Sequence, residues 1–192
     1  MMSALTSNQP ENAVPASPGR PAVLSRERLA EAAIEMGIGK LTVRGLAARL
    51  GVGHSALYRW VRDRDEILDL VSDTLLERAV AKLGQEPEDW REWLVRFARS
   101  LRAEFDPIIG EVGIALFPRT TPRYQALIGE VENRFAQSGI DKAVAADTFQ
   151  IFFLTVWGWL AVEKACADQI DHARHFDMML DALVRGLPVA DG

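Results

Sequence analysis

Residues 54–64, HSALYRWVRDR, bring together side chains that can form hydrogen bonds with a nucleic acid. At helical spacing, Leu57 and Val61 point to one side and the polar residues to the other. The polar face of this predicted helix carries His54, Ser55, Tyr58, Arg59 and Arg62. An arginine fork fits the edge of guanine in the DNA major groove. These residue types predict binding through hydrogen bonds and charge.

The residues just before this stretch predict a second short helix and a tight turn that would hold it in place. Thr42 can act as an N-cap, because its hydroxyl can accept a hydrogen bond from a free amide of the first turn. The apolar face of this helix is expected from Val43, Leu46, Ala47 and Leu50. Gly51 follows, where a helix commonly ends in a left-handed conformation. Residues 41–61 therefore predict a helix-turn-helix, whose second helix can enter the major groove.

Several short motifs fall in a consistent register along this stretch. They are Thr42-Val43-Arg44, Leu46-Ala47, Gly51-Val52, Leu57-Tyr58, Trp60-Val61 and Arg64-Asp65-Glu66-Ile67-Leu68. With them, residues 24–76 resemble the DNA-binding domain of TetR/AcrR-type transcriptional regulators. The family often has histidine at the position of Trp60 and lysine at that of Arg64. Gly45 stands where the family usually has a better helix former, at a cost of up to ~1 kcal/mol.

The resemblance implies which side chains would meet DNA, because in the family the start of the second helix and the whole third helix face it. Phosphate contacts are implied for Thr42, Tyr58, Arg64 and, through its indole N–H, Trp60. Base edges would be read by His54, Ser55 and Arg59, whereas Arg44 would reach a base or a phosphate. For Tyr58 and Trp60, packing within the domain is the alternative.

The charge of the chain is distributed unevenly. Its net charge is −5, which by itself argues against a nucleic-acid partner. Residues 20–64, however, hold nine Lys/Arg against four Asp/Glu, whereas residues 65–192 hold 13 against 22. The basic part coincides with the predicted helix-turn-helix, and the acidic remainder would repel DNA and help to orient the molecule. Chance asymmetry on a solvated surface is the alternative explanation.

The composition, 48% hydrophobic and 26% charged, is ordinary for a globular protein. The single cysteine, Cys166, allows no internal disulfide and fits a reducing cytosol. Residues 1–19 contain no Lys or Arg and no continuous apolar core, so no secretory signal is expected. The longest nearly apolar run, 151–162, is too short for a bilayer, which needs ~20 residues. We expect a cytoplasmic protein without a membrane partner.

Catalytic and metal sites are not expected. His172 and His175 lie three residues apart with Cys166 upstream, which loosely resembles a metal cluster. No second cysteine or nearby pair of carboxylates would close such a site. A phosphate-binding glycine-rich motif, a nucleophile elbow and a Cys-His pair are also missing from the sequence. We therefore predict no enzymatic activity, no catalytic residue, no metal and no cofactor.

Hydrophobic periodicity predicts an all-α chain of about nine helices. Residues 1–22 are expected to be a disordered arm, in which Arg20 either reaches a minor groove or belongs to a plain flexible tail. Residues 23–70 would form a three-helix DNA-binding domain and residues 71–192 a helical ligand-binding and dimerisation domain. The expected helices span about 26–36, 43–50, 54–61, 64–83, 89–105, a short segment within 108–117, 122–137, 142–167 and 171–187.

Large apolar side chains in the second domain, most of them aromatic, are candidates for a ligand pocket between helices. The candidates are Phe97, Leu101, Phe105, Phe117, Phe153 and Trp157. Each of these residues alone is more often an ordinary core residue. The resemblance to the family, more than the aromatic residues themselves, favours a cavity there.

The last two predicted helices are more apolar than two solitary helices need to be, which suggests half of a four-helix bundle completed by a second copy. The residues expected at this dimer interface are Phe152, Trp159, Phe176, Met179 and Leu183. Trp157-Gly158 followed by Glu163, and Leu180-Asp-Ala-Leu183 followed by Gly186-Leu187, resemble the ligand-binding domain of the same family.

Taken with the resemblance, these patterns predict a homodimeric transcriptional regulator, normally a repressor. It would bind a palindromic double-stranded DNA operator and be released by a small, largely apolar effector. Two alternatives stay open: an architectural DNA binder without an effector, and a helical adaptor that has lost DNA binding. The sequence does not identify the effector, the operator or the regulated genes, and it does not separate repression from activation.

Overall fold

A computed structural model of the chain describes residues 24–84, 89–112, 120–163 and 171–187. Within these ranges the chain forms eight α-helices, one short 3-10 helix and no strand, which confirms the predicted all-α class. The arm predicted at 1–22, with Arg20, lies outside the described residues, as do Phe117 and Cys166.

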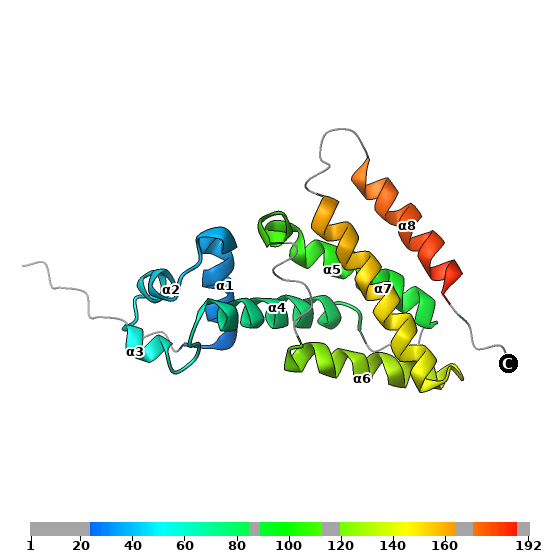
Figure 1. The fold of residues 1–192 in the computed structure, drawn as a ribbon, viewed down its shortest axis with the longest axis horizontal. Coiled ribbons are helices and arrows are strands. Elements are labelled where there is room, and N and C mark those ends of the chain that lie inside the picture. The colour runs from blue at the N-terminus through cyan, green and yellow to red at the C-terminus, as the bar shows by residue number, and fades with distance from the viewer. Residues whose placement is uncertain (1–23, 85–88, 113–119, 164–170, 188–192) are drawn as a thin grey trace, which may run out of the picture.

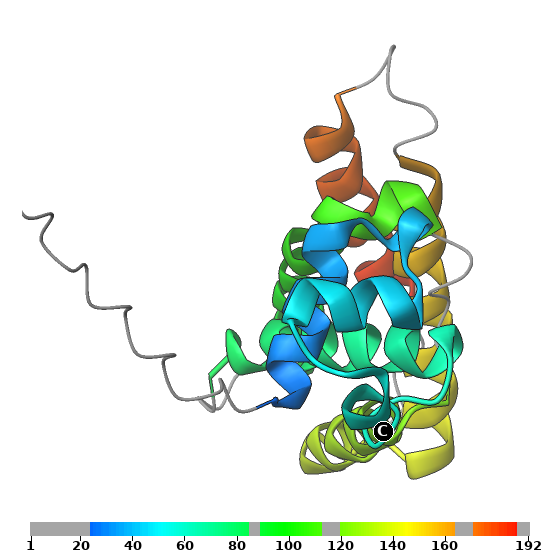
Figure 2. The ribbon, with the colours of Figure 1, turned by 90° about the vertical axis from the view of Figure 1, so that its left-hand side faces the viewer.

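The first three helices form a compact head at one end of the molecule (Figures 1 and 2). They are α1 (Arg26–Met36), α2 (Val43–Leu50) and α3 (His54–Leu57), with the 3-10 turn η1 (Ile38–Lys40) between the first two. The centre of the head is a set of fully buried apolar side chains that includes Leu29, Ile38, Leu46 and Leu57. This core fixes α3 against α2 and leaves the polar side of α3 on the surface.

Polar caps set the ends of these helices as the sequence predicts. The Thr42 hydroxyl accepts a hydrogen bond from the Gly45 amide at 3.0 Å, and an Asp63 carboxylate oxygen accepts one from the Glu66 amide at 2.9 Å. Gly51 ends α2 in the left-handed conformation, with φ of 66°. Caps of this kind satisfy amides that have no partner inside the helix.

α3 is shorter than the helix predicted over residues 54–61. Beyond Leu57 the chain continues in tightened turns, because the amides of Trp60 and Val61 both donate to the Leu57 carbonyl, at 2.8 Å and 3.1 Å. Arg59 and Trp60 therefore lie on these turns and not on a regular helix.

The long helix α4 (Arg64–Ala81) leaves the head and runs into the second part of the molecule (Figure 1). It packs against α1 in the head and against α5 and α6 beyond it. Its buried residues span almost its whole length, from Ile67 to Ala79. α4 therefore belongs to the cores of both parts.

The rest of the body is formed by α5 (Trp90–Val112), α6 (Pro122–Gln137), α7 (Lys142–Glu163) and α8 (His172–Gly186). α5 packs on α4, α7 and α8, and α6 packs on α4 and α7. By length and composition α7 is apolar enough to cross a membrane. Its packing against α5, α6 and α8 accounts for the same apolar character in a core helix.

The prediction that the fifth helix ends at Asp106-Pro107 is wrong. α5 continues through Pro107 to Val112, so the separate short helix expected within 108–117 does not begin at residue 108. Proline removes one hydrogen bond and crowds the carbonyl four residues earlier. Pro107 and Ala103 both lie on the exposed side, where water can bond the freed carbonyl, while Ile108 and Ile109 are buried and hold the last turns in place.

Two glycine-to-alanine substitutions separate backbone strain from side-chain packing. A Cβ atom would meet nothing within 4 Å at either Gly51 or Gly129, but only Gly51 has a positive φ. We expect Gly51→Ala to lower the free energy of unfolding by about 1–2 kcal/mol. Gly129→Ala, inside α6, should raise it by up to about 1 kcal/mol. Urea unfolding followed by circular dichroism measures both, and equal effects of the same sign would contradict this assignment.

Candidate functional site

All eight residues predicted to contact a nucleic acid are exposed on the head. They are Thr42, Arg44, His54, Ser55, Tyr58, Arg59, Trp60 and Arg64. Tyr58 and Trp60 retain 52% and 44% of their accessible surface. Burial inside the domain, the alternative explanation for these two aromatic residues, therefore does not apply. Exposed aromatic rings with a polar tip are available to a partner.

The arginines of the head differ in how much of their charge is available. Arg62 forms an ion pair with Glu66, and Arg49 forms one with Glu35. Hydrogen bonds from the side chain and backbone amide of Arg62 lower the pKa of Glu66. Arg44 and Arg59, in contrast, have no hydrogen bond or ion pair with any residue that the structure describes.

Arg64 combines two roles at the start of α4. One of its terminal nitrogens donates a hydrogen bond to the Ile38 carbonyl at 3.1 Å, which ties α4 to η1. The residue as a whole stays exposed, so its remaining guanidinium donors can still reach an anion. The contact with Ile38 was not visible from sequence, because 26 residues separate the partners.

Gly45 has a structural reason to be in α2. A Cβ atom there would lie 2.9 Å from the Met36 methyl group and 2.9 Å from the Thr42 hydroxyl oxygen. The first contact could be relieved by moving a flexible side chain, but the second involves the atom that caps α2. The low helix propensity of this glycine is therefore offset by an undisturbed cap.

The predicted pocket residues that the structure describes lie together in the core of the body. Phe97, Leu101, Phe105, Phe153 and Trp157 are each at most 2% exposed. Phe153 stacks on Trp157 with ring centroids 5.9 Å apart, and Phe105 meets the edge of Trp157 at 4.9 Å. We refer to these four aromatic residues, together with Leu101, as the aromatic cluster. The four rings pack against one another between α5 and α7.

Tyr124 of α6 also touches this cluster, with its ring 5.2 Å from that of Phe153. Burial raises the pKa of the Tyr124 phenol, so the group stays neutral at physiological pH. Tyr124 is not among the residues predicted to line a pocket. Tyr124 therefore brings a residue with a polar hydroxyl group to the border of the aromatic cluster.

A largely buried ion pair joins the middle of α5 to the end of α7, next to a ring of α8. Arg102 donates to both carboxylate oxygens of Glu163, with 3.2 Å from Nε to Oε2, and its guanidinium lies 5.0 Å from the centre of the Phe176 ring. Glu163 is 8% exposed. Breaking such a pair would leave an unpaired buried charge, which is strongly destabilising.

The outer surface of α7 and α8 carries exposed apolar side chains. Ile151, Leu154 and Val162 fall along one side of α7, and Met178 lies on α8, each between 41% and 56% exposed. Trp159, Met179 and Leu183 are partly buried. Phe152 and Phe176, also predicted at a dimer interface, are at most 1% exposed and belong to the core of a single protomer. In this structure the protomer itself covers both rings.

Among the described residues, no group of three His, Cys, Asp or Glu side chains could hold a metal ion. His172 and His175 lie on the first turn of α8. His172 lies 3.9 Å from Glu163, which is already paired with Arg102. Cys166 lies outside the described residues, so the loose metal pattern of the sequence gains no support.

Comparison with known proteins shows similarity to bacterial regulators. An HTH-type transcriptional repressor of Mycobacterium tuberculosis is 34% identical over 140 residues, which cover 70% of this chain and 54% of the relative. The class A tetracycline repressor of Escherichia coli, from transposon 1721, is 39% identical over 69 residues, covering 35% of this chain and 32% of that protein. The chain thus spans about half the length of the first relative and a third of the second. No protein-family model matches the chain.

Solved structures share the fold over most of their length. A TetR variant from Acinetobacter baumannii AYE in complex with minocycline superposes with a TM-score of 0.72 at 27% identity, covering 85% of this chain and 96% of that one. ActR from Streptomyces coelicolor, in complex with actinorhodin, gives a TM-score of 0.71 at 23% identity, with 86% and 97% covered. At 23% identity, the similarity to ActR supports a shared fold only.

Substitution of two arginines tests the head surface as a nucleic-acid interface. Arg59→Ala should reduce discrimination at particular base pairs by ~1–3 kcal/mol per lost contact. Arg64→Gln should weaken all duplexes about equally and lower the salt slope of binding by roughly one. Fluorescence anisotropy with labelled duplexes over a range of salt concentrations distinguishes the two effects.

Arg78→Gln is the matched control, because Arg78 pairs with Glu31 at the junction of α1 and α4, away from α3. Thermal unfolding shows whether loss of the Arg64–Ile38 contact affects stability. If both Arg59→Ala and Arg64→Gln bind every duplex as the wild type does, this surface of the head does not contact DNA.

Proposed function

Because this chain belongs to the TetR family of helix-turn-helix regulators, we propose that it is a dimeric transcriptional repressor. It binds a palindromic DNA operator through two heads and is released by a small, largely apolar molecule. Its curated relatives are transcriptional regulators and not enzymes, which agrees with the predicted lack of catalysis.

The observation that carries this proposal is the surface of the head. Arg44 and Arg59 are exposed without a charge partner among the described residues, beside the exposed rings of Tyr58 and Trp60. The basic stretch 20–64 lies in a chain whose remainder is acidic. A cationic surface presented by a helix-turn-helix suits the DNA backbone and major groove.

The proposed dimer uses the exposed apolar side of α7 and the neighbouring part of α8. Ile151, Leu154 and Val162 each leave 41–54% of their accessible surface exposed in the protomer. A second copy related by two-fold symmetry would cover this strip with the same strip of its own. Trp159, Met179 and Leu183 would border the interface, while Phe152 and Phe176 would support it from the core.

The proposed effector site lies at the aromatic cluster between α5 and α7. Minocycline is bound in the A. baumannii structure and actinorhodin in ActR, so this fold accommodates ring compounds in other proteins. An apolar ligand here would have to separate rings that now touch, and it would press on α5 and through it on α4. A ligand changes DNA affinity only if it favours one conformation over another.

The two alternatives are separated by one experiment in two stages. Salt-dependent binding to duplex DNA excludes an adaptor that has lost DNA binding. Release of bound DNA by an apolar compound then excludes an architectural binder without an effector.

A neutral fluorescent compound, N-phenyl-1-naphthylamine, provides the probe for the second stage. We expect its fluorescence to rise on binding and the DNA affinity to fall. A fall of about 100-fold would require that the compound favour the released form by about 2.7 kcal/mol, near the upper end of usual coupling energies. Binding of the compound without any change in DNA affinity would support the architectural alternative instead.

Substitution of an exposed residue tests the dimer interface without disturbing the protomer. Leu154→Glu places a charge at a position that is 41% exposed in one protomer but would be covered in the dimer. We expect a folded monomer in sedimentation velocity. Phe152→Ala is the contrasting variant, because it removes a fully buried ring and should destabilise the protomer by about 3–5 kcal/mol. A fully dimeric Leu154→Glu protein would rule out this interface.

A further inference from the structure

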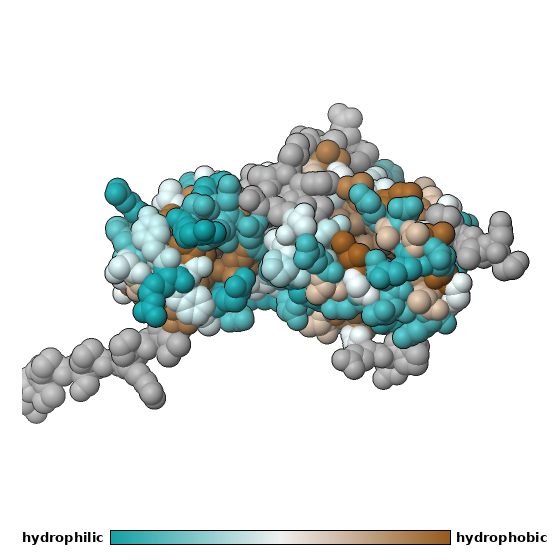
Figure 3. All heavy atoms as spheres, turned by 60° about the horizontal axis from the view of Figure 1, so that its bottom comes forward, coloured by the Kyte–Doolittle hydropathy of each residue, from teal (hydrophilic) through white to brown (hydrophobic). Residues whose placement is uncertain are grey.

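The described part of the body contains a groove next to the aromatic cluster, since Trp93, which lines the groove, stacks on Phe97. It has a volume of about 500 Å³ and is bordered by the end of α4, the start of α5 and one side of α6. Figure 3 brings α6 forward and shows a largely hydrophilic face interrupted by apolar patches. None of the aromatic-cluster residues lines the groove.

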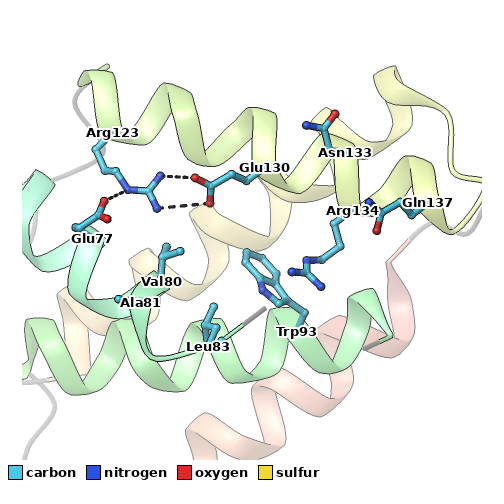
Figure 4. A pocket seen from close by; sticks show the side chains of 11 residues that line it. Glu77, Val80, Ala81, Leu83, Trp93, Arg123, Glu130, Asn133, Arg134 and Gln137 are labelled. Carbon is cyan, nitrogen blue, oxygen red and sulfur yellow. Dashed lines mark hydrogen bonds and ion pairs between the residues drawn. The ribbon is translucent and has the colours of Figure 1, made fainter. Parts of the chain in front are cut away.

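One end of the groove holds a cation whose charge is already neutralised. Arg123 of α6 forms ion pairs with Glu77 of α4 and with Glu130 about two turns further along α6 (Figure 4). Its nitrogens reach the two carboxylate oxygens of Glu130 at 2.9 Å and 3.5 Å. Both carboxylates at this end are therefore engaged, and a cationic ligand would have to compete with Arg123 for them.

The other end of the groove holds a cation without a carboxylate. The Arg134 guanidinium lies 5.1 Å from the centre of the Trp93 ring, and no described carboxylate pairs with it. Trp93 is only 3% exposed and stacks on Phe97, so it holds a fixed position under Arg134. Asn133 and Gln137, on the same part of α6 as Arg134, also line the groove and carry amide groups.

The floor between these two ends is apolar. Val80, Ala81 and Leu83, at the end of α4, line the groove together with Trp93 (Figure 4). An apolar floor with a few convergent polar groups, in a volume between about 300 and 1,000 Å³, is the usual construction of a small-molecule site. The charge that a ligand would meet without competition is that of Arg134.

We propose that this groove binds a small organic anion with an apolar ring, of the aromatic carboxylate class. The carboxylate accepts the forked donors of Arg134, and amide groups of Asn133 and Gln137 complete its hydrogen bonds. The ring packs on Val80 and Leu83. Ligand binding at this site requires neither DNA binding nor opening of the aromatic cluster. The proposal can therefore be tested independently of the proposed function.

Three compounds of similar shape but different charge test which ligand charge the groove prefers. They are anionic benzoate, neutral benzamide and cationic benzamidine. Ligand-observed NMR titration of the full chain measures each dissociation constant. For ligands of this size we expect benzoate to bind with a dissociation constant on the order of 1–10 mM. Benzamide and benzamidine should each bind at least about tenfold more weakly, since neither offers an anion to Arg134.

Variants at Arg134 place the binding in this groove. Arg134→Gln should abolish the preference for benzoate, whereas Arg134→Lys should keep part of it, because the charge remains while the planar fork is lost. Arg49→Gln, which removes an arginine from the head, should bind benzoate as the wild type does. Thermal unfolding of each variant verifies that it is folded.

Three results would overturn the proposal. Benzoate could bind Arg134→Gln as tightly as it binds the wild type, or benzamidine could bind more tightly than benzoate, which would assign the groove to cations through Glu77 and Glu130. Absence of measurable benzoate binding to the wild type in this range is the third. If Arg134→Gln failed to fold, the order of the three probes on the wild type and on Arg134→Lys would still decide the question.

Discussion

The burial of α4 in both parts of the molecule is the constraint on which the rest of the structure depends. Ile67, Leu68 and Val71 occupy its first turns, and Leu75, Leu76 and Ala79 its later ones. Burial of each large aliphatic side chain contributes roughly 1.5–3 kcal/mol. Neither end of α4 can leave its surroundings without losing several such contributions. Displacement of one end should therefore move the helix as a rigid body.

This constraint connects the head to the body in both directions. Asp63 caps α4 and Arg64 ties its first turn to η1, beside the surface that we assign to DNA. At its other end, α4 packs on α5, which contributes Phe97 and Leu101 to the aromatic cluster, and on α6. The Glu77–Arg123 ion pair adds a polar link between α4 and α6. A change in the packing of the body thus has a short path to the position of α3.

Sequence reasoning succeeded where local chemistry decides the outcome. The starts at Thr42 and Asp63 and the end at Gly51 follow from caps and from a left-handed glycine, which depend on neighbouring residues only. The bounds of α1 and α6 were also predicted correctly. Pro107 misled the prediction, because proline usually ends a helix. The tertiary burial of Ile108 and Ile109, which sustains the helix here, cannot be read from spacing.

The candidate sites show the same division. The sequence suggested that Tyr58 and Trp60 are exposed but did not establish it, because an amphipathic aromatic residue can lie either in a core or on a surface. Phe152 and Phe176 were assigned to a dimer interface because hydrophobicity does not tell which neighbour buries a side chain; the structure shows that the protomer itself does so. The groove at Arg134 and the Arg102–Glu163 pair join residues distant in sequence, so no local pattern indicates them.

Selection of bound fragments from a pool of random duplex DNA tests the central claim most directly. The full chain is incubated with the pool at physiological salt, and retained duplexes are amplified and sequenced over several rounds. A dimer with two exposed helix-turn-helix heads predicts an enriched inverted repeat, because the two-fold symmetry of the protein is mirrored in its site. Recovery of no enriched sequence, or of a single motif without two-fold symmetry, would contradict a dimeric operator-binding regulator.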